Sequence, residues 1–115
     1  MSGWEHFTAA ELECPHCGQM QMSNDFMRKL VAVRREINIP LHVTSGFRCP
    51  EHNRNVGGAT SSKHLAGRAV DIALNMSEEN QVTLLELAIK HGLVGIGVAK
   101  TFIHLDDTRR RLWAY

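Results

Sequence analysis

The chain has 115 residues, 43% of them hydrophobic, and its 13 basic and 12 acidic residues leave a formal net charge of +1. This composition excludes a disordered chain and gives no reason to expect a nucleic-acid partner, and the length suits one domain rather than two. No apolar run approaches the roughly 20 residues that span a bilayer. The opening "MSGWEHFTAAELE" lacks the regions of a secretory signal, so we expect synthesis in the cytoplasm without a leader.

The N-terminal third carries the signals of two helices. In "FTAAELE", Thr8 and Glu11 have the spacing of a capping box, which predicts a short helix. Residues 23–37 place apolar side chains at the helical period behind an N-cap at Ser23 or Asn24.

A strand, a long loop and a second strand follow. The stretch "LHVTSG" is typical of a short strand, and residues 48–63 are polar and rich in turn formers, which predicts a long loop. The segment "RAVDIAL" then alternates as a strand does, with Asp71 on one face between two alanines and larger apolar residues on the other.

The C-terminal part predicts one more helix and further strands. Residues 77–91 form a helical pattern between an N-cap at Ser77 and Gly92 at the C′ position. Residues 95–115 suggest two or three short strands joined as hairpins. Helices followed by short strands predict the α+β class, with a small antiparallel sheet and flanking helices.

Asp71 needs a partner, because an unpaired carboxylate in an apolar run is costly to bury. His64 precedes a turn at Gly67 that can fold its imidazole back toward this strand. In the later segment "FIHLD", His104 lies on one strand face, so two neighbouring strands could bring His64, Asp71 and His104 to a common point.

Two imidazoles and a carboxylate suit Zn²⁺, and three protein ligands leave a fourth position for water, as in catalytic sites. Zinc lowers the pKa of bound water to about 7 and polarises a carbonyl, which are the two requirements of amide hydrolysis. The residues alone leave an ordinary alternative open. His64 would then be a loop histidine, Asp71 a capping acid and His104 a hydrogen-bonded core histidine.

Three segments, "TSGFRCPEHNRNVGG", "SSKHLAGRAVDI" and "GIGVAKTFIHLD", resemble motifs of the zinc D-Ala-D-Ala carboxypeptidase family. That family includes L-alanyl-D-glutamate peptidases of phage lysis systems and shares a fold with the hedgehog signalling domain. The pattern S-x-H-x-x-G-x-A-x-D is matched at Ser62, His64, Gly67, Ala69 and Asp71. The similarity covers residues 7–113 and implies a catalytic Zn²⁺ held by His64, Asp71 and His104.

Amide hydrolysis also requires a general base. Many members of the resembled family carry an acid three residues before the last histidine ligand, where this chain has Thr101. The nearest carboxylate on the strand face of His104 is Asp106, which we predict to be the catalytic base. The alternative is that Asp106 accepts the N–H of a ligating histidine; Asp107 points to the other face and is the weaker candidate.

Two further residues are candidates for substrate binding. Arg48 matches an arginine that such peptidases use to grip substrate, and a guanidinium can bind the carboxylates of peptidoglycan stem peptides through two hydrogen bonds. Its alternative is an ordinary surface arginine. Ser62 either hydrogen-bonds the substrate backbone or caps the turn before His64.

Three cysteines cannot all pair within one chain. The segments "CPHC" and "CPEH" together supply Cys14, Cys17, Cys49 and His52, a set that could close a second, structural zinc site. A disulfide between two of the cysteines, or free thiols, are the alternatives.

The terminal "TRRRLWAY" contains three consecutive arginines. They could attract the protein to anionic cell-wall polymers, but alternate arginines facing solvent from an edge strand are the plainer interpretation. Trp113 and Tyr115 are expected to cover the core or to line a substrate groove.

These observations predict a single zinc peptidase domain over residues 1–115 that hydrolyses amide bonds in peptidoglycan stem peptides or cross-links. We expect a monomeric phage endolysin or virion-associated lytic enzyme that reaches the cell wall after release. The alternatives are a bacterial D,D-carboxypeptidase or endopeptidase, and a zinc-containing, hedgehog-like binding module without activity, which the absence of an acid at Thr101 keeps open. A nucleic-acid-binding zinc protein lacks the required positive charge.

Overall fold

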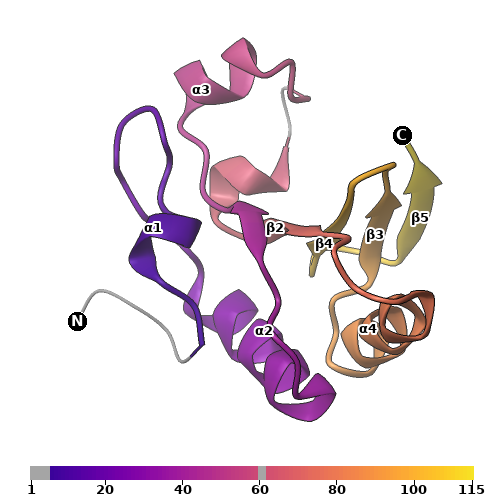
Figure 1. The fold of residues 1–115 in the computed structure, drawn as a ribbon. Helices are drawn as coiled ribbons and strands as arrows, with labels where there is room; N and C mark the ends of the chain where they lie inside the picture. The colour runs from indigo at the N-terminus through magenta and orange to yellow at the C-terminus, as the bar shows by residue number, and fades with distance from the viewer. Residues whose placement is uncertain (1–5, 60–61) are drawn as a thin grey trace.

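The computed structural model describes residues 6–59 and 62–115. The first five residues of the N-terminal stretch, for which we predict no secretory signal, lie outside the described residues. One five-stranded sheet, ordered β1-β2-β4-β3-β5, is flanked by helices (Figure 1). This arrangement confirms the predicted α+β class. The elements in chain order are α1 (Ala9–Leu12), α2 (Asn24–Ile37), β1 (Val43–Ser45), α3 (Pro50–Asn55), the 3₁₀ helix η1 (Lys63–Ala66), β2 (Ala69–Ala73), α4 (Glu78–Lys90), β3 (Gly95–Val98), β4 (Phe102–Asp106) and β5 (Arg111–Ala114).

Hydroxyl caps start the helices where the sequence predicts them. The Thr8 side chain caps α1 in a complete capping box with Glu11. The Ser23 hydroxyl accepts the Phe26 N–H at the start of α2, and the Ser77 hydroxyl accepts an N–H in the first turn of α4. Each cap satisfies a backbone donor that a helix N-terminus otherwise leaves without a partner.

The two faces of the sheet differ in chemistry. Val70 and Ile72 of β2, with Ile103 and Leu105 of β4, join a buried apolar core with side chains of α2 and α4. The residues between them point to the opposite face because side chains alternate along a strand. The apolar residues of β2 and β4 therefore anchor the sheet on the helices and leave Asp71 and its neighbours on a polar face.

The last strand does not form the predicted hairpin. β3 and β4 pair as an antiparallel hairpin, whereas β5 pairs with β3 in parallel. Both edges of β4 are already occupied, by β2 on one side and β3 on the other. The chain that leaves β4 passes to the outer edge of β3, the free edge nearer to β4, and it runs parallel to β3.

Part of the predicted loop over residues 48–63 is helical: α3 covers residues 50–55, and η1 begins at Lys63. Pro50 is the first residue of α3, a position where its fixed φ and missing N–H suit a helix, and Cys49 is the N-cap. Ser62 caps η1. Residues 60–61 lie outside the described part of the chain.

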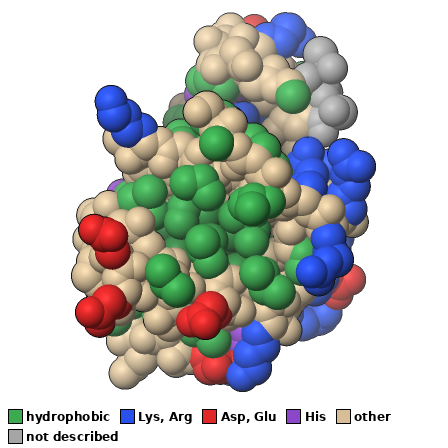
Figure 2. Space-filling model, turned by 90° about the vertical axis from the view of Figure 1, so that its right-hand side faces the viewer, with side chains coloured by type: hydrophobic (Ala, Val, Ile, Leu, Met, Phe, Trp, Pro, Cys, Tyr) green, Lys and Arg blue, Asp and Glu red, His purple; other side chains and the backbone are tan. Residues whose placement is uncertain are grey.

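The face that carries α4 and β5 shows a broad group of hydrophobic side chains (Figure 2). A shallow apolar groove there is lined by Leu85, Ile89, Val94, Ile96 and Leu112, with Arg110 and Arg111 at its border. Within the described residues, no helix is long and apolar enough to cross a membrane.

Gly67 connects η1 to β2 and provides a test of this packing. Its φ is +68°, and a Cβ at this position would overlap the Gln21 carbonyl ahead of α2. Gly57 has a similar φ of +72° but no atom near its Cβ position. Left-handed backbone strain costs a non-glycine residue about 1–2 kcal/mol.

We expect Gly57→Ala to lower the free energy of unfolding by about 1 kcal/mol, and Gly67→Ala to lower it by at least about 2 kcal/mol because the clash adds to the strain. Urea unfolding followed by circular dichroism measures both. Equal losses would contradict a close contact between the η1–β2 turn and the segment before α2.

Candidate metal centre and its cavity

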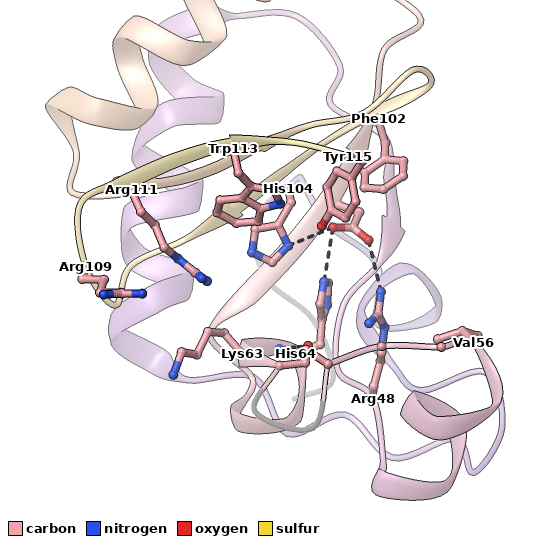
Figure 3. A pocket seen from close by; sticks show the side chains of 15 residues that line it. Arg48, Val56, Lys63, His64, Phe102, His104, Arg109, Arg111, Trp113 and Tyr115 are labelled. Atoms are coloured by element: carbon pink, nitrogen blue, oxygen red, sulfur yellow. Dashed lines mark hydrogen bonds and ion pairs between the residues drawn. The ribbon is translucent and has the colours of Figure 1, made fainter.

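A cavity of about 580 Å³ opens on the polar face of the sheet. Side chains from η1, β2, β4 and β5 line it, together with residues of the connection between α3 and η1 (Figure 3). Segments far apart in the sequence therefore contribute to one hollow, at whose base lie His64, Asp71 and His104.

The structure brings these three predicted residues together. One oxygen of Asp71, Oδ1, lies 3.2 Å from His64 Nε2 and 3.2 Å from His104 Nδ1. The possible ligand atoms of the three residues all lie within 4.8 Å of one another. Their exposed fractions are only 2–5%, so bulk water is almost excluded from the group.

Strand register and a turn place the three side chains. Asp71 of β2 lies directly opposite His104 of β4 in the antiparallel ladder, and directly opposed side chains on one face are near neighbours. His64 comes from η1, and the left-handed turn at Gly67 leads directly from that helix into β2. The imidazole of His64 is thereby folded back over the Asp71 carboxylate.

The outer nitrogen of each imidazole has its own acceptor. His64 Nδ1 lies 2.7 Å from the Gly46 carbonyl oxygen, and His104 Nε2 lies 2.8 Å from Asp106 Oδ2. A carbonyl can only accept, so His64 Nδ1 carries its proton there, and the ionised Asp106 similarly attracts the proton of His104. In the neutral rings, the lone pairs of His64 Nε2 and His104 Nδ1 then face Asp71. Three acceptors meet at this point, and they require protons or a cation between them.

The pKa values follow from this arrangement. Burial opposes ionisation of Asp71, but the hydrogen bonds that His104 and His64 donate when a ring proton faces this carboxyl outweigh burial and hold its pKa well below the ordinary range. Burial alone would lower the pKa of His104, but hydrogen bonds to Asp106 and Asp71 raise it above the ordinary histidine value. The group therefore favours positive charge beside the Asp71 carboxylate.

Asp106 does not reach the cavity. Its side chain is fully buried, and the residues that line the cavity do not include it. Besides His104, its carboxylate accepts the Thr108 hydroxyl at 2.8 Å and Arg111 Nη2 at 3.0 Å. Burial opposes the ionisation of Asp106, but the hydrogen bonds from His104 and Thr108 outweigh the effect of burial. The pKa of Asp106 therefore lies well below its ordinary value. Asp106, the residue predicted to be the general base, is therefore held beside His104 and lies outside the lining of the cavity.

Arg48 lies at the cavity as predicted, but its donors are engaged within the chain. Its Nη2 is 3.3 Å from Asp71 Oδ2, its Nη1 is 3.2 Å from Asn53 Oδ1, and its Nε is 3.3 Å from Ser45 Oγ. The guanidinium therefore neutralises the second oxygen of Asp71 (Figure 3). Ser62 lines the cavity, and its hydroxyl accepts the His64 N–H at 3.2 Å, so it caps η1.

The arginine-rich tail contributes more to the site than its sequence predicts. Arg109 and Arg111 line the cavity rather than merely facing solvent, and Arg111 lies 4.4 Å above the ring of Trp113. Trp113 and Tyr115 line the cavity too. The period-two alternation of positions 111, 113 and 115 is a signal that could have placed all three on one strand face.

Basic side chains outnumber acidic ones in the lining of the cavity, although Arg48 is paired with Asp71 and Arg111 with the buried Asp106. Arg48, Lys63, Arg109 and Arg111 line the cavity, and Asp71 is its one acidic side chain among the described residues. The cavity therefore suits an anionic ligand, and within the described part of the chain it offers no further acidic side chain as a proton acceptor.

The cysteines also meet, but without the predicted histidine. The sulfur atoms of Cys14, Cys17 and Cys49 lie within 4.8 Å of one another, and all three thiols are free. No ring nitrogen of His52 belongs to this cluster; the ring stacks on that of His16, with centroids 6.4 Å apart.

Comparison with known proteins supplies the family. The family described as peptidase M15 matches residues 5–106, which include η1, β2 and β4. The zinc D-Ala-D-Ala carboxypeptidase of Streptomyces albus G is 38% identical over 71 residues, covering 61% of this chain and 27% of that protein. The chain therefore spans little more than a quarter of the relative that it matches. Because the family match extends over most of the chain, including the His64, Asp71 and His104 group, the chain belongs to the peptidase M15 family.

Proposed function

We propose that this domain is a zinc-dependent peptidase that hydrolyses amide bonds in peptidoglycan stem peptides or their cross-links. The observation that carries the proposal is the meeting of His64, Asp71 and His104 at the base of a cavity in a peptidase M15 domain. A relative named as a zinc D-Ala-D-Ala carboxypeptidase supports the metal and the substrate class.

The donor set fits Zn²⁺. Two imidazole nitrogens and one carboxylate oxygen are ligands that zinc accepts, and three protein ligands are typical of its catalytic sites. His64 Nε2, Asp71 and His104 Nδ1 would hold the ion, with each outer ring nitrogen bonded to a fixed acceptor. When bound, zinc supplies Lewis-acid activation of water and of the scissile carbonyl.

Asp106 acts on the reaction through His104. Its carboxylate holds His104 Nε2–H at 2.8 Å, which turns Nδ1 toward the cavity and keeps it free to bind metal. Arg111 and Thr108 fix the carboxylate in turn. We therefore assign Asp106 as a positioning residue rather than the general base.

The cavity wall supplies the recognition of substrate. Stem peptides carry free carboxylates, and Arg109, Arg111 and Lys63 surround the space beside the metal ligands with cationic groups. Phe102, Trp113 and Tyr115 provide apolar walls against which small side chains such as alanine pack. The named relative suggests a D-Ala-D-Ala bond; cleavage between L-Ala and D-Glu uses the same cation-lined space.

A zinc-containing binding module is the second candidate. The described cavity lining holds no acidic side chain besides Asp71, and Thr101 stands where many members of the resembled family carry an acid. A protein that binds stem peptides without cleaving them would retain the same metal ligands. Hydrolysis of purified sacculi separates the two functions, because only the peptidase releases new amino termini. The identity of the new terminus names the cleaved bond, and lysis of intact cells by added protein tests the role as a phage lytic enzyme.

Removal of a metal ligand is the first test. We expect His64→Ala to lose one equivalent of bound zinc and to lower the release of amino termini from sacculi by more than about 100-fold. Loss of a hydrogen bond to a metal ligand already lowers metal affinity or activity about 10–100-fold, and loss of the ligand itself should cost more. A chelator should abolish release by the unaltered protein. The control is His42→Ala, whose exposed side chain lies outside the cavity. Release that survives both His64→Ala and chelation would contradict a zinc peptidase.

The role of Asp106 can be tested against its sequence neighbour. Asp106 raises the pKa of His104, so Asp106→Asn should lower that pKa toward the ordinary histidine value in metal-free protein, as an NMR titration would show. The zinc affinity at neutral pH should fall about 10–100-fold because the ring is no longer oriented. Asp107→Asn removes the same charge one residue later, but Asp107 bonds Arg68 and Lys29, so it should leave both quantities unchanged.

A general-base role would give a different result for Asp106→Asn. Zinc affinity would then be preserved while turnover fell. Protons also compete with zinc for His104, so metal affinity of the unaltered protein should decrease as pH falls through the raised His104 pKa.

Two adjacent arginines test substrate recognition. Arg109 lines the cavity, whereas Arg110 borders the apolar groove on the other face. We expect Arg109→Ala to raise KM for soluble stem peptides about tenfold, the value of one charge-assisted hydrogen bond, with little change in kcat. Arg110→Ala should leave KM unchanged. Equal effects of the two substitutions would indicate general electrostatic attraction instead of a specific contact.

A further inference from the structure

A second group of metal-binding side chains lies where the N-terminal segment meets α3. The sulfur atoms of Cys14, Cys17 and Cys49 lie within 4.8 Å of one another, and none is in a disulfide. A tetrahedral zinc site with bonds of about 2.3 Å to sulfur places the sulfurs about 3.8 Å apart. The three thiols are therefore close to a ligand arrangement already.

The backbone turns the first two cysteines in one direction. Cys14 and Cys17 have the C-x₂-C spacing of structural zinc sites, and Gly18, with φ of +73°, follows them. The turn is closed by Gly18 N–H to the Cys14 carbonyl and by Cys14 N–H to the Gln19 carbonyl, both at 2.7 Å. This hydrogen-bonded turn brings both sulfur atoms close to that of Cys49.

Backbone donors also favour thiolate. The Cys49 N–H points at Cys14 Sγ at 3.5 Å, and the His52 N–H points at Cys49 Sγ at 3.4 Å. Thiolate is the form of cysteine that binds metal.

His16 is the histidine placed to complete the set. Its Nδ1 lies 3.7 Å from Cys49 Sγ, and its side chain, 40% exposed, has room to turn toward the other two sulfurs. Its other nitrogen, Nε2, lies 2.9 Å from a carboxylate oxygen of Glu51. Histidine ligands of metals commonly donate their second ring N–H to a carboxylate in this way.

We propose that Cys14, Cys17, Cys49 and His16 bind a structural Zn²⁺, separate from the His64, Asp71 and His104 group. Four protein ligands leave no open position, so this ion serves structure rather than hydrolysis. His16 takes the place that the sequence assigned to His52.

The ion would connect the N-terminal segment that carries Cys14 and Cys17 to the segment around Cys49, which supports the cavity. Cys49 directly follows Arg48, which bonds Asp71. The Phe47 N–H already bonds the Leu12 carbonyl at 2.9 Å, and the Gly46 carbonyl holds His64 Nδ1. A metal link between Cys14, Cys17 and Cys49 therefore secures the backbone from which both contacts are made.

Zinc content of the full chain tests the proposal independently of activity. We expect about two zinc ions per chain in the unaltered protein and about one in either Cys17→Ser or His64→Ala. With Co²⁺ in place of zinc, thiolate-to-cobalt charge-transfer absorption should persist in His64→Ala and disappear in Cys17→Ser. These measurements distinguish the two metal centres. A result that contradicts the proposed peptidase activity would therefore not contradict the proposed zinc site at the cysteines.

The matched pair His16→Ala and His52→Ala tests the fourth ligand. His16→Ala should weaken zinc binding at the cysteine cluster by at least the roughly 10–100-fold that loss of a ligand's hydrogen bond costs, and His52→Ala should not. Circular dichroism checks that each variant is folded. The proposal of a zinc site at the cysteines is wrong if His64→Ala retains no zinc. It is also wrong if the mass of the unreduced protein shows a disulfide. A larger effect of His52→Ala than of His16→Ala overturns the assignment of His16.

Discussion

The buried carboxylate of Asp71 is the constraint on which the site depends. It lies in a strand whose neighbours are apolar, and a charge in that position is tolerated only when other groups compensate it. His64 and His104 both contact one of its oxygens, and Arg48 contacts the other. Three segments of the chain are held in place by a single ionised group, and the proposed zinc ion would occupy the point where they meet.

A series of polar contacts connects the last strand, β5, to the site. His104 bonds Asp106, Asp106 bonds Arg111, and Arg111 lies over Trp113. β5 therefore contributes the Arg111 guanidinium and the Trp113 ring to the wall of the cavity, and its backbone pairs with that of β3. Gly97 of β3 allows this close approach, because a Cβ there would lie 2.5 Å from the Trp113 ring.

Local patterns along the chain determine a large part of the fold. The hydroxyl caps at Thr8, Ser23 and Ser77 depend only on residues within one helical turn, so the sequence is sufficient to predict them. The alternation in β2 and β4 similarly sets Asp71 and His104 on one face and the apolar residues on the other, since strand periodicity is a local property. The motif around His64 is specific enough to identify the family.

Only the tertiary structure decided which residues meet across long sequence distances. The strand faces put Asp106 on the side of His104, but burial under Arg111 and Thr108 removes it from the cavity. The course of β5 depends on which sheet edges are already occupied, so local alternation could group Arg111 with Trp113 on one strand face but could not bring it to Asp106. His16, rather than His52, faces Cys49 because the turn around Cys14 and Cys17 carries it there. The sequence determined helices α1, α2 and α4, the strand faces and the family. The packing of distant segments decided which polar groups reach the cavity, because burial and contact depend on every element at once.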